Sequence, residues 1–276
     1  MIRRGAEAFE AYYADVFPAR WDAIKTAILA YEERGIALRT AADRPYFLDA
    51  ASVVPAMAAG PSGDRAILDM CAAPGGKTLV LAGTMTGGGQ LTANERSANR
   101  RARLRRVLDE HVDSGLRQQI TVTSHDARRW GLYETEIYDL ILADVPCSSE
   151  AHLLKGNGDI AQWTPRRSSR IAIDQYAILR AAVQALKTGG TIVYSTCALS
   201  PTENGDLVSR VLKKGAPSAR LGTIEPEEEA LSFAASHGLT LETCSVGYQI
   251  LPDRSSGSGP IYFCLIRKDA EDLNTL

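Results

Sequence analysis

Two cysteines in this chain directly follow apolar runs that end in short polar motifs. Cys147 stands in YDLILADVPCSS, three positions after Asp144, and Cys197 stands in TIVYSTCALS. A lone cysteine is usually a small buried hydrophobe, but two of them beside a carboxylate at strand ends indicate chemistry. A thiolate is a nucleophile. A thiol with an ordinary pKa of about 8.5 needs nearby positive charge or donors to ionise at neutral pH, and Lys77 is the candidate for that charge.

A thiolate beside a methyl donor suits methylation of a pyrimidine ring. The C5 carbon of a pyrimidine is a poor nucleophile, but thiolate attack on C6 turns the ring into an enamine whose C5 can attack a sulfonium methyl group. Asp144 would hold the N3 and N4 edge of a cytosine and neutralise charge as the adduct forms. The second thiol would then help to remove the C5 proton or release the product.

The stretch AILDMCAAPGGKT predicts the loop that holds a cofactor. It combines a short buried strand over 66–70, a Pro-Gly-Gly turn at 74–76 and a helix from Lys77. A P-loop requires glycine where Cys71 stands, and the dinucleotide fingerprint requires a third glycine. The next strand, GQLTANE, ends in Glu95, whose carboxylate suits a ribose diol. These features fit an adenosine site without a pyrophosphate clamp, as S-adenosyl-L-methionine needs.

Strands and helices alternate along the rest of the chain. Apolar runs ending at Asp126, Asp144 and Cys197 predict three further strands, and helices are predicted over 97–112 and over 171–187, the latter closed by a Gly-Gly pair at 189–190. This alternation predicts an α/β fold with a mostly parallel sheet and helices on both faces. Ligands bind beyond the carboxyl ends of such strands. The apolar stripe of the 97–112 helix is Leu104, Val107, Leu108 and Val112.

The first 60 residues are predicted to form a small helical extension. Two helices are expected over 6–34, with a stop at Gly35, followed by a break at 44–49 and a short helix, ASVVPAMAA. The turn Gly60-Pro61-Ser62-Gly63 marks the predicted boundary between domains 1–60 and 61–276. Near the other end, 253–259 is predicted to be a mobile loop before a last strand, GPIYFCLIRK. In the second helix Trp21, Ile24, Ile28 and Tyr31 share one face.

Composition excludes several classes of protein. With 31 basic and 33 acidic residues, a net charge of -2 does not hold a polyanion by global attraction. Five widely spaced cysteines without a C-x-x-C pair argue for a reducing compartment and against a disulfide framework or a metal site. The absence of an apolar run of about 18 residues predicts no transmembrane helix. The N-terminal sequence lacks the character of a transit peptide, and a targeting segment cleaved before this numbering stays open.

Four motifs, taken in order, resemble the Nop/Sun family of RNA cytosine-C5 methyltransferases. They are DMCAAPGGKT, the acid of ANE, DVPCSS and YSTCALSPTEN. Three further segments, PYFLDAASVVP, TSHDARRWG and GPIYFCLIRK, resemble the short mitochondrial ribosomal-RNA branch, so the resemblance covers about 46–268. It implies a Rossmann-like class I fold and methylation of mitochondrial small-subunit rRNA with S-adenosyl-L-methionine through a covalent Cys-C6 adduct. It also implies an involvement in ribosome assembly.

The resemblance assigns roles to individual residues. Cys197 in the Thr-Cys motif would be the nucleophile and Cys147 in the Pro-Cys motif would assist product release, whereas DNA cytosine methyltransferases use the Pro-Cys position. One departure is Gly205, which stands after Asn204 where the family commonly has an acid, and which is expected to loosen support around the nucleophile. The donor site would comprise Cys71, Ala72, Pro74, Gly75, Gly76 and Lys77 around the methionine part, Glu95 on the ribose, Arg100 behind it, Asp126 and Ala127 at the adenine, and Asp144 between donor and base.

The resemblance also implies a protein partner, because the short branch lacks an appended RNA-binding domain and phosphate contacts supply most nucleic-acid affinity. The partner would be a helical-repeat, mitochondrial termination-factor-like protein or the assembling ribosomal subunit. Local arginine pairs at 128–129 and 166–167 are either phosphate contacts or ordinary surface charge, and the same alternatives hold for Arg103 and Arg106. No membrane partner is expected.

Two alternatives to rRNA methylation stay open at this point. One is that the chain keeps the methyltransferase fold as a ribosome assembly factor whose methylation is dispensable, and the other is that it methylates tRNA by the same chemistry. The resemblance favours a mitochondrial location, and a cytoplasmic one is the alternative.

Overall fold

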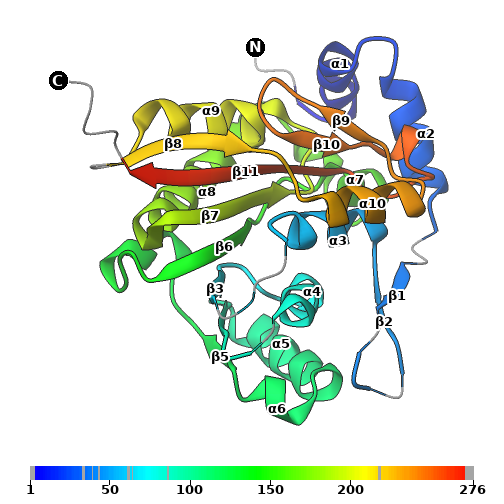
Figure 1. The fold of residues 1–276 in the computed structure, drawn as a ribbon. Helices are drawn as coiled ribbons and strands as arrows, with labels where there is room; N and C mark the ends of the chain where they lie inside the picture. Colours follow the sequence, from blue (N-terminus) through cyan, green and yellow to red (C-terminus); the bar gives the residue numbers. More distant parts are fainter. Residues whose placement is uncertain are drawn as a thin grey trace.

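The centre of the molecule is one large mixed sheet (Figure 1). The computed structural model describes residues 4–270 except 33, 34, 39, 43, 61, 62, 64, 86, 217 and 218. Within these residues nine strands lie in the order β5-β4-β3-β6-β7-β11-β10-β9, and β8 pairs with β11. The strands are β3 (Ala66–Asp69), β4 (Gln90–Asn94), β5 (Ile120–Thr123), β6 (Tyr138–Asp144), β7 (Leu186–Thr196), β8 (Ala219–Ile224), β9 (Leu241–Thr243), β10 (Tyr248–Ile250) and β11 (Ile261–Ala270).

The strands from β5 to β7 run parallel, and the later strands add an antiparallel half. The parallel strands are near-continuous apolar runs because helices cover both of their faces. The chain passes outward from β3 through β4 to β5 and then returns to the other side of β3 with β6. This reversal is a topological switch point, where open α/β sheets bind ligands at the carboxyl ends of their strands. The predicted α/β fold class is confirmed.

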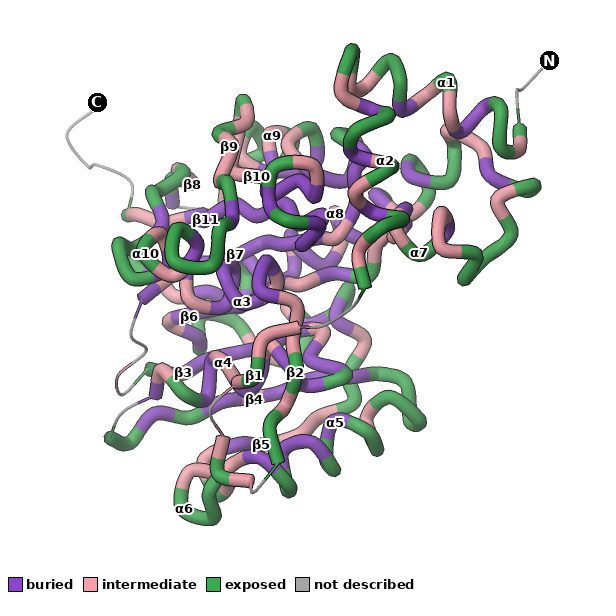
Figure 2. The backbone as a smooth tube through the Cα atoms, turned by 90° about the vertical axis from the view of Figure 1, so that its right-hand side faces the viewer, coloured by how far each residue is buried: buried purple, intermediate pink, exposed green. Residues whose placement is uncertain are grey.

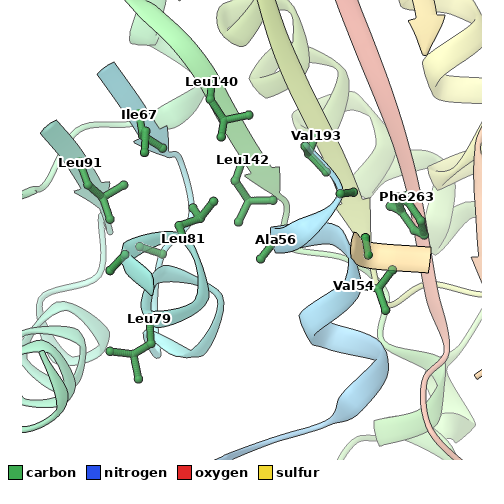
Figure 3. Close-up of a cluster of buried hydrophobic side chains, with 14 of the residues drawn as sticks. Val54, Ala56, Ile67, Leu79, Leu81, Leu91, Leu140, Leu142, Val193 and Phe263 are labelled. Carbon is green, nitrogen blue, oxygen red and sulfur yellow. The ribbon is translucent and has the colours of Figure 1, made fainter. Parts of the chain in front are cut away.

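Two apolar layers cover the sheet. On one face, α3 (Ala50–Met57), α4 (Gly76–Thr84), α5 (Ala98–His111) and α10 (Glu228–Ser236) bury a core against the strands, and Figure 3 shows Val54 and Leu81 reaching toward Leu142 and Val193. On the other face, α8 (Arg166–Ala185) and α9 (Gly205–Lys214) pack on β6, β7 and β11. In Figure 2 the strands run as buried tube through the middle, and the outer turns of α5 and α6 (Ser114–Arg117) are exposed.

The helices α1 (Ala6–Val16) and α2 (Trp21–Ala30) form a third, separate aromatic core. Phe9 and Tyr13 of α1 lie against Trp21 and Trp163, with ring centroids 4.7–6.0 Å apart within this group. The same core includes α7 (Glu150–Leu154), which begins three residues after Cys147. The N-terminal helices are therefore anchored on the segment that carries one of the two thiols.

The predicted boundary at residue 60 stays a prediction. Pro61 and Ser62 of its turn lie outside the described residues. The short helix α3, on the N-terminal side of that boundary, is buried in the main core with α4 and α10. Its N-terminus is capped by Asp49, whose side chain accepts a hydrogen bond from the backbone of Ala51 at 2.8 Å.

Three local predictions were wrong. The helix predicted over 171–187 begins at Arg166 and ends at Ala185, and β7 starts at once, so the Gly-Gly pair lies inside a strand. A side chain at Gly190 would meet Leu186 and the carbonyl of Asp139, because β7 shifts register past β6 there. The second N-terminal helix ends at Ala30, before the predicted stop.

The segment predicted as a break at 44–49 contains a strand. β2 (Tyr46–Leu48) pairs antiparallel with β1 (Ile36–Leu38) in a hairpin beside α4. The loop at 253–259 is present, and it begins within a short 3-10 turn, η4 (Pro252–Arg254). Two of its serines are buried and bonded: Ser255 accepts from the backbone of Thr240 at 3.1 Å, and Ser258 donates to Asp49 at 3.2 Å.

Candidate active site

The carboxyl ends of β6 and β7 bring the two predicted cysteines into contact. The strands pair in parallel with Asp144 opposite Ser195, so the residues that follow them emerge side by side. Both cysteines are free, and their Sγ atoms lie 2.9 Å apart. Ser149 Oγ lies 3.3 Å from the sulfur of Cys197 and 3.4 Å from that of Cys147. Fifty positions separate these thiols in the sequence, and the sheet register places them together.

The environment pushes the pKa values of the two thiols in opposite directions. The hydrogen bond from Cys147 lowers the pKa of Cys197, and it outweighs burial, which raises it. Hydrogen bonding from Ser149 and the positive charge of Lys77 lower it further. The pKa of Cys147 is raised, first by its hydrogen bond to Cys197 and then by burial. Of the two thiols, Cys197 is therefore the one whose ionisation the surroundings favour.

Lys77 and Asp144 form an ion pair beside the thiols. Lys77 Nζ lies 3.0 Å from Asp144 Oδ2, and Ser195 Oγ donates to Asp144 Oδ1 at 2.7 Å. Burial acts to lower the pKa of Lys77, but the charge of Asp144, the hydrogen bond to it and the charges of Cys197 and Asp69 together outweigh burial and raise the pKa. Lys77 is thus a permanent cation at the start of α4. Asp144, the last residue of β6, therefore lies between the Lys77 ammonium group and the Ser195 hydroxyl group.

Two buried carboxylates frame the cysteine loops, and sequence reasoning missed both. Glu150 accepts hydrogen bonds from Tyr13 Oη at 2.7 Å and from the backbone of Leu199 at 2.9 Å. Ser148 also donates to Glu150. Glu150 therefore ties the residue after Cys147 to the segment after the other thiol, and α1 supplies one of its partners.

Glu203 holds the Cys147 loop from its other side. Its Oε2 accepts from the backbone of Ser148 at 2.9 Å and from Gln175 Nε2 at 3.0 Å, while its Oε1 has no partner. Burial raises the pKa of Glu203. Because a buried carboxylate is expensive unless it is bonded, this group and Glu150 fix the loops at a stability cost.

Asn204 holds the Cys197 loop directly. Its side chain accepts from Thr196 Oγ1 at 2.6 Å and donates to the carbonyl of Ala198 at 2.9 Å, so it bonds on both sides of the thiol. Gly205 begins α9, and a Cβ there would make only ordinary contacts, with Val246 at 3.6 Å. Asn204 thus supports the Cys197 loop. These contacts do not show the looser support that was expected from Gly205.

A first cavity of about 330 Å³ lies along the carboxyl ends of β3, β4 and β5 and is closed by α8. Glu95, only 6% exposed, accepts from the backbone of Ser97 at 2.7 Å and lies 3.4 Å from Arg100. Arg100 also donates to the carbonyl of Ala73 at 2.7 Å. Of the predicted cofactor residues, those lining this cavity are Cys71, Glu95, Arg100, Asp126 and Ala127, and Cys147 lines it too.

The glycine turn after Cys71 contains predicted cofactor residues that do not line the first cavity. Gly75 has φ +121°, and a Cβ there would lie 2.9 Å from Val107, while one at Gly76 would lie 2.8 Å from Leu48. The turn is therefore glycine because α5 and β2 press on it. The predicted residues that do not line the first cavity are Ala72, Pro74, Gly75, Gly76, Lys77 and Asp144.

The first cavity fits an adenosine. A buried acid suits a ribose diol, and the apolar side chains of Pro146 and Ile178 suit the faces of a flat ring. At the rim, the hydrogen bond from Arg128 lowers the pKa of Asp126 to about 2 and keeps it charged. Further lining residues missed in the sequence are Met70, Asn94, His125, Pro146 and Ile178. For all of these except Ile178, which lies in α8, the position at or just after a strand end was the available signal.

A second cavity of about 270 Å³ opens on the other thiol. Cys197 lines it together with Ser149 and His152 of the Cys147 loop and Phe47 of the hairpin. Cys147 lines the first cavity and Cys197 the second, so the paired thiols form the boundary between the two. A ligand in each cavity would meet at these sulfurs.

The predicted basic pairs differ in their surroundings. Arg128 forms ion pairs with Asp126 at 2.7 Å and with Asp174 at 2.9 Å, so its charge is paired within the protein. Arg167 donates to the carbonyl of Ser148 at 3.5 Å, next to Cys147. In the described part of the chain, no three His, Cys, Asp or Glu side chains gather as metal ligands would. No helix within the same residues is long and apolar enough to span a membrane.

The sheet order, the glycine turn and the acid that follows β4 are features of a Rossmann-like fold whose first cavity suits S-adenosyl-L-methionine. The chain belongs to the family described as 16S rRNA methyltransferase RsmB/F, which matches residues 56–265. This family membership agrees with the resemblance carried by the four motifs.

Named relatives and a solved structure support the assignment. The "5-cytosine rRNA methyltransferase NSUN4" of Mus musculus is 36% identical over 234 residues, which cover 81% of this chain and 60% of that protein. The "tRNA (cytosine(34)-C(5))-methyltransferase, mitochondrial" of Mus musculus is 32% identical, with 81% and 63% covered. The crystal structure of NSun6 from Pyrococcus horikoshii with SFG is 25% identical, with a TM-score of 0.61, covering 81% and 53%. The chain thus spans about 60% of the length of these two relatives.

Proposed function

We propose that this protein methylates C5 of a cytosine in ribosomal RNA, with Cys197 as the covalent nucleophile. The observation that carries the proposal is the pair of touching thiols with opposite pKa shifts at the boundary of two cavities. The name of the NSUN4 relative, which specifies rRNA and 5-cytosine, supports the choice of substrate. The two cavities suit a methyl donor on one side and a base on the other.

S-adenosyl-L-methionine, when bound, supplies an electrophilic methyl group. Glu95 would hold its ribose diol, with Arg100 fixing that carboxylate and the neighbouring Ala73 carbonyl. Asp126 and the Ala127 backbone would bracket the adenine at the far end of the first cavity. The Gly75 turn would lead the methionine part toward the sulfurs.

The reaction begins at Cys197. Its thiolate forms a bond to C6 of the cytosine, and the C5–C6 electron pair moves into the ring toward N3, which takes a proton. Asp144, between Lys77 and Ser195, is the carboxyl placed to give that proton to N3, and the Lys77 charge stabilises the carboxylate that remains. C5 then becomes the nucleophile that takes the methyl group.

Bond formation at Cys197 also prepares Cys147. The hydrogen bond to the Cys197 thiolate is the main cause of the raised pKa of Cys147. Once the Cys197 sulfur is bonded to carbon, it accepts this hydrogen bond poorly, so the pKa of Cys147 falls. Cys147 then loses its proton to solvent and, as a thiolate, takes the C5 proton. This restores the C5–C6 double bond and breaks the Cys197–C6 bond, while the proton on N3 returns to Asp144. Formation of the Cys197–C6 bond thereby prepares Cys147 to act as the base in the last step.

A single-turnover assay tests the proposal. Wild type and Cys197→Ala are compared on native small-subunit rRNA with labelled donor, and transfer is expected only with wild type. Unchanged transfer by the variant would refute the nucleophile assignment. The absence of transfer by wild type on every precursor particle would favour a ribosome assembly factor whose methylation is dispensable.

A tRNA substrate is the second candidate, because one relative at 32% identity is named for cytosine 34 of tRNA. Bisulfite sequencing of cellular RNA after depletion of the protein separates the two, since the lost 5-methylcytosine lies in only one class of RNA. The word "mitochondrial" in that relative's name motivates the proposal of a mitochondrial location. Co-purification with a termination-factor-like protein or with a small-subunit precursor would test the proposed partner and the role in ribosome assembly.

A further inference from the structure

Phe47 is an exposed aromatic residue at the cavity of the nucleophile. It lies in the middle of β2, is 63% exposed and lines the second cavity together with Cys197. A single exposed hydrophobic side chain usually needs no explanation. Phe47 differs from the other exposed apolar residues, such as Leu132, which is 72% exposed, because it borders the cavity of the reactive thiol.

The hairpin holds Phe47 in a fixed place. Side chains alternate along a strand, and Tyr46 and Leu48 point to the protein. The Tyr46 ring lies 5.3 Å from His111 of α5, and Leu48 reaches Gly76 at the start of α4. Their cross-strand partners Leu38 and Ile36 share that face and pack on the main core. The same alternation turns Phe47 to the opposite face, so an anchored hairpin presents a free ring.

Tyr31 and Lys155, which also line the second cavity, place an aromatic ring next to a cation. Lys155 Nζ lies 5.5 Å from the centroid of the Tyr31 ring and donates to the Tyr31 carbonyl at 3.2 Å. His152 lines the cavity beside them. The acid in the cavity, Asp49, is already engaged by the backbone of Ala51 and by Ser258. Aromatic rings with a nearby cation are what single-stranded nucleic acid requires, since bases stack and phosphates are anionic.

We propose that Phe47 stacks on the base next to the target cytosine and so holds the RNA strand while the target nucleotide reaches Cys197. This inference rests on the proposed function and adds a binding site for a flanking nucleotide. Stacking is tolerant of base identity because every base has a π-face. The site therefore contributes affinity and placement and leaves sequence choice to other contacts.

RNA binding by unreactive protein tests this proposal separately from the chemistry. The background variant is Cys197→Ala, and the probes are a fluorescein-labelled cytidine pentamer and the same pentamer with abasic riboses on both sides of the central cytidine. Anisotropy titrations compare this background with added Phe47→Ala, Phe47→Trp or Leu132→Ala. We expect Phe47→Ala to weaken binding of the intact pentamer by about 5- to 150-fold, and Phe47→Trp and Leu132→Ala to leave it within twofold.

The abasic probe decides between stacking and other roles. Without flanking bases there is nothing to stack, so Phe47→Ala is expected to change its binding by less than about twofold. Equal losses on both probes would overturn the proposal and would point to hairpin support or a protein contact. No loss on the intact pentamer would also overturn it. Because no methyl transfer is measured, a wrong assignment of the reaction would appear in the single-turnover assay and not here.

Discussion

The Cys147 loop and the Cys197 loop begin alike and end with opposite chemistry. Each follows a parallel strand of the same sheet, and their sulfurs are 2.9 Å apart. The hydrogen bond to Cys197 and then burial raise the pKa of Cys147, whereas hydrogen bonds to Cys147 and Ser149 and the charge of Lys77 lower the pKa of Cys197 against burial and the charge of Asp144. The comparison teaches that residue type alone does not distinguish the two thiols, because their surroundings push their pKa values apart.

The two loops also differ in what holds them. The Cys147 loop is bonded to Glu150 and Glu203, and through Glu150 to Tyr13 of the N-terminal helices. The Cys197 loop is bonded chiefly to Asn204, from its own end of the chain. Through Glu150, Tyr13 supports the Cys147 loop at Ser148 and also the segment after Cys197 at Leu199. Each of the following experiments changes one side of this comparison.

Loss of the nucleophile has the largest expected effect. Cys197→Ala should reduce single-turnover methyl transfer on the order of 10³-fold or more, because no other thiolate reaches C6. Cys244→Ala, a free cysteine outside both cavities, is the matched control and should transfer at the wild-type rate. Comparable losses in both variants would mean that the loss in Cys197→Ala does not reflect a special role of this thiol.

Removal of the cation comes next. Lys77→Met takes away the charge that lowers the pKa of Cys197 and the partner of Asp144. Transfer at pH 7 should fall by about 10²-fold and recover in part as the pH rises, since a thiol with a higher pKa still ionises at higher pH. The exposed Lys213→Met serves as control. A loss that is independent of pH would remove Lys77 from thiolate formation.

Alkylation rates give the pH dependence of each thiol. Since thiolates react with iodoacetamide, Cys197 should approach its plateau rate at a lower pH than Cys147 does. Cys147→Ala removes the main donor and should slow Cys197 at pH 7 by about tenfold for each unit by which its pKa rises. Cys147→Ser keeps a donor and should slow it less. If both variants left the pH profile of Cys197 unchanged, the hydrogen bond would not be the cause.

The smallest effect concerns the frame around the Cys147 loop. Tyr13→Phe removes one hydrogen bond from buried Glu150 and should lower the free energy of unfolding by about 1–3 kcal/mol in denaturant titrations. Tyr12→Phe, whose hydroxyl lies 3.4 Å from Ser200, should cost less. Equal costs would show that the bond to Glu150 has no special part in holding the loop.

Much of the sheet could be predicted from the sequence, because buried parallel strands are apolar runs of recognisable length. The run ending at Asp144 became β6, and the predicted last strand, GPIYFCLIRK, became β11. The hairpin of β1 and β2 was missed because strands of three residues are too short to show the alternating pattern of a strand. The Gly-Gly pair at 189–190 was misread because a register shift inside a strand and a helix end use the same residue type.

The candidate site also contains some residues that could be predicted from the sequence and others that could not. Cys147, Cys197, Asp144 and Glu95 were predictable because each ends a strand, and strand ends of a parallel sheet meet at one edge. Glu150 and Glu203 were not, because a carboxylate in a helix or a turn looks exposed until its buried partners are known. The direction of the hydrogen bond between the thiols depends on side-chain positions that no sequence pattern records.

Trapping of the covalent intermediate tests the central claim most directly. RNA and donor are incubated with wild type, Cys147→Ala and the double variant Cys147→Ala/Cys197→Ala, and each mixture is run on a denaturing gel. We predict a protein–RNA adduct that accumulates in Cys147→Ala, because the bond to Cys197 forms and is not released, and that is absent from the double variant. An adduct that persists without Cys197, or that forms only when Cys147 is present, would contradict the account.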